Sequence, residues 1–172
     1  MPKYEYAEIK KEEEIIEHEK ILFDAFINRA PDEWMVNHYE RIDNCRLKPP
    51  YPYSDLIILG VKKDNTLLAT CLINLNNKNK MQLEELGFSR SSIDVNSNFA
   101  EGLAFCTNGN RFTIDDFAIM EDVMSFFKKE FKKHNLQKIY ATCNERLKIF
   151  YFKLGFQIID KKDKELLLEL IV

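Results

Sequence analysis

The stretch from Lys138 to Asp160 constrains the fold of this chain more than any other part of the sequence. Its apolar and β-branched residues predict a strand, an amphipathic helix and a second strand, at residues 138–143, 145–154 and 156–160. Asn144 stands directly before the helix, where asparagine is a favourable cap. Gly155 follows the helix, at a position where glycine commonly ends one. The residue types at both ends therefore limit this helix to about ten residues.

Length and composition point to one domain without a membrane-spanning segment. A chain of 172 residues is long enough to bury one core and too short for two independent ones, so a single domain over residues 1–172 is expected. No apolar run approaches the roughly 20 residues that a membrane span needs. The charged N-terminus lacks a secretion signal, which favours a cytoplasmic protein with no membrane partner. A formal net charge of −3 gives no electrostatic case for binding nucleic acid.

The remaining elements follow from periodicity and turn residues. Asp64-Asn65 is typical of a tight hairpin turn, Gly87 ends a short helix, and Thr113 with Asp116 resembles a capping box. The predicted elements before residue 138 are a strand, two helices, a proline-rich loop, a hairpin, a polar insert, a strand and a helix, at 4–10, 11–29, 31–43, 46–54, 56–75, 76–98, 99–106 and 113–135. A last strand covers 165–172. This order predicts an α+β (α/β) fold with a mixed sheet. The strand–helix–strand unit over 99–143 is expected to be right-handed, with its two strands parallel or splayed around a common point.

Four residue positions in the opening stretch carry a resemblance to a known family. Asn144, Leu147, Tyr151 and Gly155-Phe156 have the spacing of the C-terminal signature of the GCN5-related N-acetyltransferase (GNAT) superfamily, although alanine is commoner than leucine at the second position. The resemblance implies one domain with a mostly antiparallel sheet of about six to seven strands, flanked by helices on both faces. It also implies an N-acyltransferase that moves acetyl from acetyl-CoA to a small-molecule or peptide amine by direct attack.

The same resemblance implies two catalytic residues. Tyr151 takes the position near the thioester sulfur, where a phenol with a pKa of about 10 can protonate the departing thiolate. Glu101 takes the place of a general base on the strand FAEGLAFC. A buried carboxyl there has a raised pKa, which suits a base. The alternatives are a core aromatic residue for Tyr151 and a solvated side chain for Glu101.

The resemblance also implies a site for acetyl-CoA at the turn after this strand. The family has a glycine-rich turn whose amides bind the pyrophosphate, whereas this chain has TNGNR with one glycine and a different spacing. Asp115 and Asp116 oppose an anion there, and Arg111 offsets one of them. The candidate cofactor-binding residues are Phe105, Cys106, Thr107, Asn108, Gly109, Asn110, Arg111, Phe112, Thr113 and Asn144.

Two other functions remain open. Acyl-homoserine lactone synthases and long-chain N-acyl amino acid synthases share the core, often with a long segment before the glutamate-bearing strand, and take acyl-carrier-protein or acyl-CoA thioesters. The insert over 76–98 favours this hypothesis. Ala104 counts against it, because an arginine is often found at this position in these enzymes. A catalytically inactive fold used as a binding module is the third possibility, because the phosphate turn departs from the family pattern.

Cysteine and histidine give no sign of a metal site. The four cysteines lack paired spacing, so reduced, buried thiols are expected at Cys45, Cys71, Cys106 and Cys143. The three histidines lie among polar residues of predicted helices, so surface positions are expected for His18, His38 and His134. Trp34, Tyr51 and Tyr53 lie in the region that builds the acceptor pocket in the resembled family, and packing is the alternative role.

Overall fold

The computed structural model describes residues 3–109, 111 and 113–172. Its strands are β1 (Tyr4–Glu8), β2 (Glu40–Arg41), β3 (Leu47–Lys48), β4 (Leu56–Lys63), β5 (Thr66–Asn74), β6 (Phe99–Thr107), β7 (Lys138–Asn144), β8 (Gln157–Lys162) and β9 (Glu165–Ile171). Its α-helices are α1 (Glu12–Phe23), α2 (Met35–His38), α3 (Gln82–Glu85), α4 (Met120–Lys133) and α5 (Lys148–Lys153). Single turns of π- or 3₁₀-helix are η1 (Asp24–Asn28), η2 (Tyr53–Asp55), η3 (Arg90–Ser92), η4 (Ile114–Ile119) and η5 (Glu145–Leu147).

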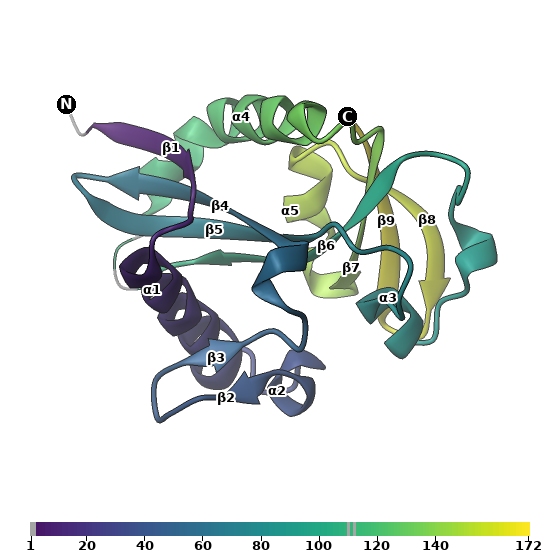
Figure 1. Ribbon diagram of the computed structural model, residues 1–172, viewed down its shortest axis with the longest axis horizontal. Helices are drawn as coiled ribbons and strands as arrows, with labels where there is room; N and C mark the ends of the chain where they lie inside the picture. The colour runs from purple at the N-terminus through teal and green to yellow at the C-terminus, as the bar shows by residue number, and fades with distance from the viewer. Residues whose placement is uncertain (1–2, 110, 112) are drawn as a thin grey trace. The chain divides into compact units, whose positions relative to one another are not determined.

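Among the described residues, seven strands form one mixed, mostly antiparallel sheet in the order β1-β4-β5-β6-β7-β9-β8. β2 and β3 form a separate pair (Figure 1). This sheet confirms the predicted fold class and strand number. Contacts divide the chain into two compact units, one of Met1–Leu72 with Ala104–Phe117 and the other of Ile73–Leu103 with Ala118–Val172.

In the first unit, β1 pairs antiparallel with β4, and a two-residue turn leads on to β5. Asp64 and Asn65 in this turn have φ values of 49° and 65°. A two-residue hairpin turn of type I′ requires this left-handed conformation at both positions, and Asp and Asn tolerate it better than most residues. The hairpin predicted from the Asp-Asn pair is therefore confirmed.

The segment between α1 and β4 is tied to α1 by the buried carboxylate of Glu19. Arg46 donates to Glu19 Oε2 from Nε at 2.8 Å and from Nη2 at 2.6 Å, and the Tyr53 hydroxyl donates to Oε1 at 2.7 Å. The predicted helix over 31–43 is wrong at both ends, because α2 covers only Met35–His38 and the residues after it form β2, which pairs with β3. The proline-rich loop also holds β3 and η2, which the prolines did not suggest. Hydrogen bonds to Glu19 supply the local order that the sequence pattern lacks.

In the second unit, β6 and β7 are parallel, with paired residues from Phe99↔Lys138 to Gly102↔Ala141. β7 pairs antiparallel with β9 along its whole length, and β9 pairs antiparallel with β8. Figure 1 shows these last three strands side by side. Of the two arrangements expected for the strands of this strand–helix–strand unit, the structure has the parallel one.

The insert between β5 and β6 is an ordered part of the second unit. Its side chains form a buried cluster with residues of β6, β7 and β9: Met81, Leu83, Phe88, Ile93, Phe99, Tyr140 and Leu167. Gly87 has a φ of 89° and ends α3, as predicted. Burial of four apolar residues from one polar-looking segment explains why it has a fixed conformation.

The long helix before β7 begins later than the sequence predicts. Residues 114–119 form the 3₁₀ turn η4, and the α-helix starts only at Met120. Phe127 and Phe131, four residues apart on one face of the helix, are buried. Asn135 has a φ of 55° just after the helix and marks the predicted end.

The signature residues Tyr151, Gly155 and Phe156 form the C-terminal end of α5. Hydrogen bonds of the backbone there explain why these residue types occur at these positions. Gly155 has a φ of 89°, its N–H donates to the Phe152 carbonyl at 3.0 Å, and the Phe156 N–H donates to the Tyr151 carbonyl at 3.1 Å. These two bonds define a Schellman motif, which usually brings the first and last residues into apolar contact. The rings of Tyr151 and Phe156 meet edge to face, with centroids 5.5 Å apart. The spacing Tyr-x₃-Gly-Phe therefore encodes the helix end and the position of the tyrosine ring together.

Replacement of Gly155 with alanine tests this helix end. We expect Gly155→Ala to lower the free energy of unfolding by about 1–2 kcal/mol, because a Cβ is unfavourable at a φ of 89°. Chemical denaturation measures the difference. Gly102→Ala is the matched control, since its added Cβ meets Ala141 at an ordinary 3.4 Å. Equal losses for the two variants would contradict the assignment.

Candidate active site

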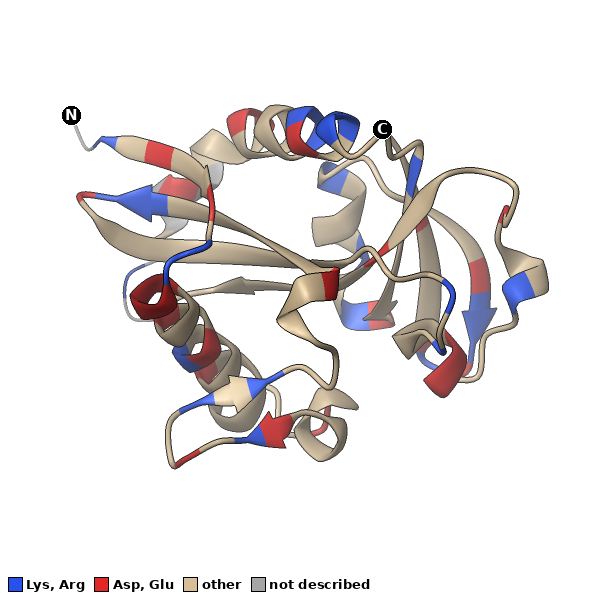
Figure 2. Ribbon diagram, viewed as in Figure 1, with Lys and Arg blue, Asp and Glu red and all other residues tan. Residues whose placement is uncertain are grey.

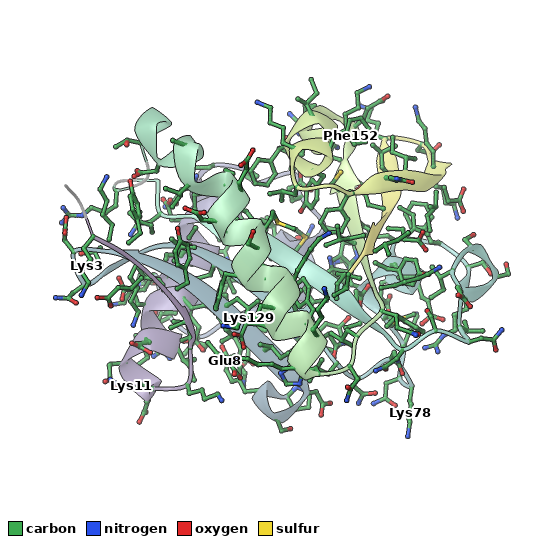
Figure 3. All side chains as sticks on the ribbon, turned by 90° about the horizontal axis from the view of Figure 1, so that it is seen from above. Lys3, Glu8, Lys11, Lys78, Lys129 and Phe152 are labelled. Carbon is green, nitrogen blue, oxygen red and sulfur yellow. The ribbon has the colours of Figure 1, made fainter. Side chains whose placement is uncertain are left out.

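The predicted acid, Tyr151, lies half-buried on α5 in the second unit. Its ring packs against a buried cluster of Cys143, Leu166 and Leu168 together with Phe156. Apolar contacts on several sides therefore fix the orientation of the ring. A side chain that acts on one particular atom of a substrate needs such a fixed orientation. Phe152, on the next position of the helix and labelled in Figure 3, is 44% exposed.

Asn144 stands at the junction of β7 and η5. Its Oδ1 accepts a hydrogen bond from the Arg146 N–H at 3.1 Å, which satisfies one of the free amides at the start of the helix. The predicted capping role is therefore confirmed. Its predicted role in holding the acyl donor stays a prediction.

Glu101 is buried in the second unit, with 2% of its surface exposed. Its carboxylate accepts the backbone N–H of Gln82 at 3.0 Å and that of Leu83 at 2.7 Å, both at the start of α3. Burial raises the pKa of Glu101 to about 7, although the two N–H donors act in the opposite direction. The alternative of a solvated glutamate is wrong, because the insert covers this side chain. A carboxyl that titrates near neutral pH can accept a proton under ordinary conditions.

The predicted cofactor turn lies in the first unit. Phe105 and Thr107 are half-buried, and burial raises the pKa of the Cys106 thiol to about 12. Asn108 is held from both sides: its N–H donates to the Leu68 carbonyl at 2.6 Å and its side-chain amide donates to the Leu67 carbonyl at 3.1 Å. Asn110 and Phe112 lie outside the described residues.

Two amides of this turn already have backbone partners, since Arg111 also donates its N–H, to the Asn108 carbonyl at 3.0 Å. Pyrophosphate in the resembled family needs such amides to point at the ligand. The turn as it stands therefore offers fewer amide donors than the family pattern.

Asp116 was expected to oppose an anion at this turn, but the structure shows that its charge is paired. It is fully buried, and its carboxylate accepts hydrogen bonds from Lys63 Nζ at 2.8 Å, the Tyr4 hydroxyl at 2.6 Å and the Thr113 N–H at 2.6 Å. Burial alone would raise the pKa of Asp116, but these donors outweigh it and hold the pKa well below its usual range. The bond from Thr113 confirms the predicted capping-box contact. The paired charge does not oppose an anion as a free aspartate would.

Arg29, which sequence reasoning missed, is a cation at the same turn. Its guanidinium donates to the Thr107 carbonyl, and its Nε forms a 2.9 Å ion pair with Asp24. A Cβ on Gly109 would lie 3.2 Å from Arg29 Cζ, so the missing side chain admits the arginine. No local pattern in the sequence marks Arg29, because 78 residues separate it from Thr107.

An open groove of about 470 Å³ runs along α1 in the same unit. Its lining residues are Glu13, Ile16, Glu17, Lys20, Ile21, Asp24 and Asn108. Figure 2 shows the acidic residues of α1 in red. Three carboxylates against one lysine make the groove a poor site for a polyphosphate and a better one for a cation.

His18 corrects another prediction. It is fully buried, and Nδ1 lies 2.9 Å from the Thr70 hydroxyl. Burial lowers the pKa of His18 to about 3, so the imidazole is neutral near pH 7. All four cysteines are free thiols, as predicted, but the expected burial holds only for Cys71, Cys106 and Cys143, because Cys45 is exposed. Within residues 3–109, 111 and 113–172, no group of His, Cys, Asp and Glu side chains could hold a metal ion.

A search for membrane spans in the described part of the chain finds no helix with the necessary length and apolar character. No protein-family model matches the sequence, and no curated protein matches it.

Solved structures match the fold over nearly the whole chain. FeeM, an N-acyl amino acid synthase from uncultured soil microbes, has 13% identity and a TM-score of 0.65, covering 99% of this chain and 91% of its own. BjaI, a CoA-dependent acyl-homoserine lactone synthase, has 11% identity and a TM-score of 0.71, covering 99% and 84%. A GNAT-family acetyltransferase from Listeria monocytogenes has 10% identity and a TM-score of 0.62, covering 98% of this chain and 95% of its own.

At these identities the likeness establishes the fold. The chain has the fold of the GNAT acetyltransferases and of the related N-acyl synthases, as the signature predicted.

The pH dependence of stability tests the buried state of Glu101. The folded-state pKa of about 7 exceeds the ordinary value of 4.5, so the folded protein binds this proton more tightly than the unfolded chain. We therefore expect the contribution of this group to fall as pH rises from about 5 to about 8, by on the order of 3 kcal/mol in total.

Urea denaturation at several pH values measures this slope in wild type and in Glu101→Gln, which cannot titrate. The slope should flatten in Glu101→Gln. Glu85→Gln, at the partly exposed end of α3, is the control and should keep the wild-type slope. Identical slopes for wild type and Glu101→Gln would contradict a raised pKa.

Proposed function

We propose that this protein is an N-acyltransferase that moves an acyl group from a thioester to a primary amine. The observation that carries the proposal is the capped helix α5, which places a packed tyrosine seven residues after Asn144 within a GNAT fold. The raised pKa of the Glu101 carboxyl gives further support, because the reaction requires a proton acceptor near neutral pH.

The proposed reaction is a direct attack. The neutral amine nitrogen forms a bond to the thioester carbonyl carbon, and the carbon–sulfur bond breaks. Glu101 accepts the amine proton through water, and Tyr151 donates a proton to the departing thiolate. The products are an amide and a free thiol, so atoms and charges balance without a metal or a redox partner.

Acetyl-CoA is the first candidate donor. Two cations, Arg29 and Arg111, lie at the turn that would hold the phosphates of acetyl-CoA. Their positive charge supports binding of an anion there, in addition to what the backbone amides of the turn provide. The other described residues proposed for this donor are Phe105, Cys106, Thr107, Asn108, Gly109, Thr113 and Asn144.

A longer acyl donor, on acyl-carrier protein or CoA, is the second candidate. Two observations favour it: the ordered insert before β6, and the turn amides that already have backbone partners. FeeM and BjaI are described as an N-acyl amino acid synthase and an acyl-homoserine lactone synthase. Ala104 stands where such enzymes often have arginine, so the acceptor would differ from theirs.

A panel of thioesters tests the proposed function. Acetyl-CoA, octanoyl-CoA and octanoyl-acyl-carrier protein are each incubated with mixed primary amines, and the released thiol is measured. We expect amine-dependent thiol release with at least one donor. Calorimetric titration with each donor separates binding from turnover. Binding without thiol release across the panel would indicate an inactive binding module, and neither binding nor release would overturn the proposal.

The role of Tyr151 is tested by Tyr151→Phe. Loss of the phenol should lower kcat about 100-fold with little change in KM for the donor, because a general acid acts in the transition state. The melting temperature should stay close to the wild-type value, since the ring keeps its contact with Phe156. Phe152→Leu, at the exposed neighbour, is the control with unchanged kcat. Full activity in Tyr151→Phe would remove Tyr151 from the mechanism.

A further inference from the structure

The start of α3 is held by two carboxylates. Glu84 Oε2 accepts the Met81 N–H at 2.9 Å, and Glu101 accepts the next two N–H groups, those of Gln82 and Leu83. All three amides belong to the set that a helix leaves unsatisfied at its N-terminus. A helix of only four residues has little stability of its own, so these bonds determine where it lies.

Arg90 connects this helix to the start of the insert. Its Nε and Nη2 donate to the two oxygens of Glu84 at 3.0 and 3.1 Å, in a bidentate pair. Its Nη1 donates to the Asn77 carbonyl at 2.8 Å, and Nη2 donates to the Asn79 carbonyl at 2.5 Å. One planar guanidinium therefore fixes the chain before α3 and the carboxylate that caps it.

The apolar residues around α3 keep water from the Glu101 carboxylate. Met81 and Leu83 flank the two amides that bind it, and both are completely buried. On the sheet, Glu101 is paired with Tyr140, a fully buried member of the same cluster. The hydroxyl of Tyr140 is engaged elsewhere, with Glu169 and the Asp94 N–H. The insert therefore accounts for much of the burial of Glu101.

We propose that Arg90 is a positioning residue for Glu101: through Glu84 and the carbonyls of Asn77 and Asn79, it holds the α3 amides and the apolar cover of the insert over the carboxylate. Arg90 does not touch the reacting groups in this scheme. The proposal rests on the proposed function only where Glu101 is assigned the role of base.

Two opposite effects on Glu101 make the proposal testable. As a nearby positive charge, Arg90 lowers the pKa of Glu101, and Glu84 raises it. As the support of the insert, Arg90 maintains the burial that raises the pKa most. Loss of Arg90 therefore raises the pKa if it acts only as a charge, and lowers the pKa toward 4.5 if it acts through the insert. Lys138 and Glu169 on the neighbouring strands are paired with each other and are unchanged by the substitution.

The experiment is an NMR titration of the Glu101 side-chain carboxyl carbon in wild type, Arg90→Met and Lys80→Met, with Glu101→Gln for assignment. Methionine keeps the length of the side chain and removes its donors. The expected result is a lower Glu101 pKa in Arg90→Met, together with about tenfold faster hydrogen exchange of the Gln82 and Leu83 amides. Lys80→Met removes a cation that forms an ion pair with Glu85, and should change neither quantity.

An unchanged or raised pKa in Arg90→Met would overturn the proposal. If Arg90→Met fails to fold, Arg90→Lys keeps the charge but cannot form the bidentate pair and both carbonyl bonds, and the same lowering of the pKa is expected. Neither readout needs turnover, so the result stands even if no donor is found. Where turnover is found, the limb of the pH profile of kcat/KM assigned to Glu101 should move to lower pH in Arg90→Met.

Discussion

A buried carboxylate that accepts several hydrogen bonds is the interaction on which the irregular parts of this chain depend. Burying an ionised carboxylate without hydrogen-bond partners is very costly, so each buried carboxylate must accept hydrogen bonds from neighbouring groups. Glu19 accepts hydrogen bonds from Arg46 and Tyr53. Asp116 accepts them from Lys63, Tyr4 and Thr113, and Glu101 accepts them from the backbone amides of α3. In each case the donors bring a segment without strong periodicity into a fixed place.

Two of these carboxylates, Asp116 and Glu101, meet different kinds of donor, and their pKa values shift in opposite directions. Asp116 faces an ammonium group and a hydroxyl, and its pKa lies far below the usual range. Glu101 faces only backbone amides within a cluster of apolar residues, and burial raises its pKa to about 7. The same residue class is therefore a permanent anion in one unit and a titrating group in the other. That contrast supports the choice of Glu101 as the proton acceptor.

The choice of donor depends on the turn after β6. A pyrophosphate needs free amides and positive charge. Arg29 and Arg111 supply positive charge at this turn, but two of its described amides already donate to backbone carbonyls. The acidic groove along α1 further disfavours polyphosphate beside Asn108. A thioester with a long acyl chain draws more of its binding energy from apolar contact and less from its phosphates. The proposed acyl transfer is compatible with either donor.

The sequence by itself determined the elements whose cause is local. Gly155, Asp64-Asn65 and the Thr113–Asp116 pair each act within a few residues, so turns, helix ends and the order of strands could be predicted, and with them the GNAT fold and the position of Tyr151 on its helix. The tertiary structure alone decided the burial of His18 and Glu101, the contact of Arg29 with Thr107, and the fold of the insert around Arg90. The physical reason is that these groups find their partners across 6 to 78 residues of sequence, where no periodic pattern records which donor meets which acceptor.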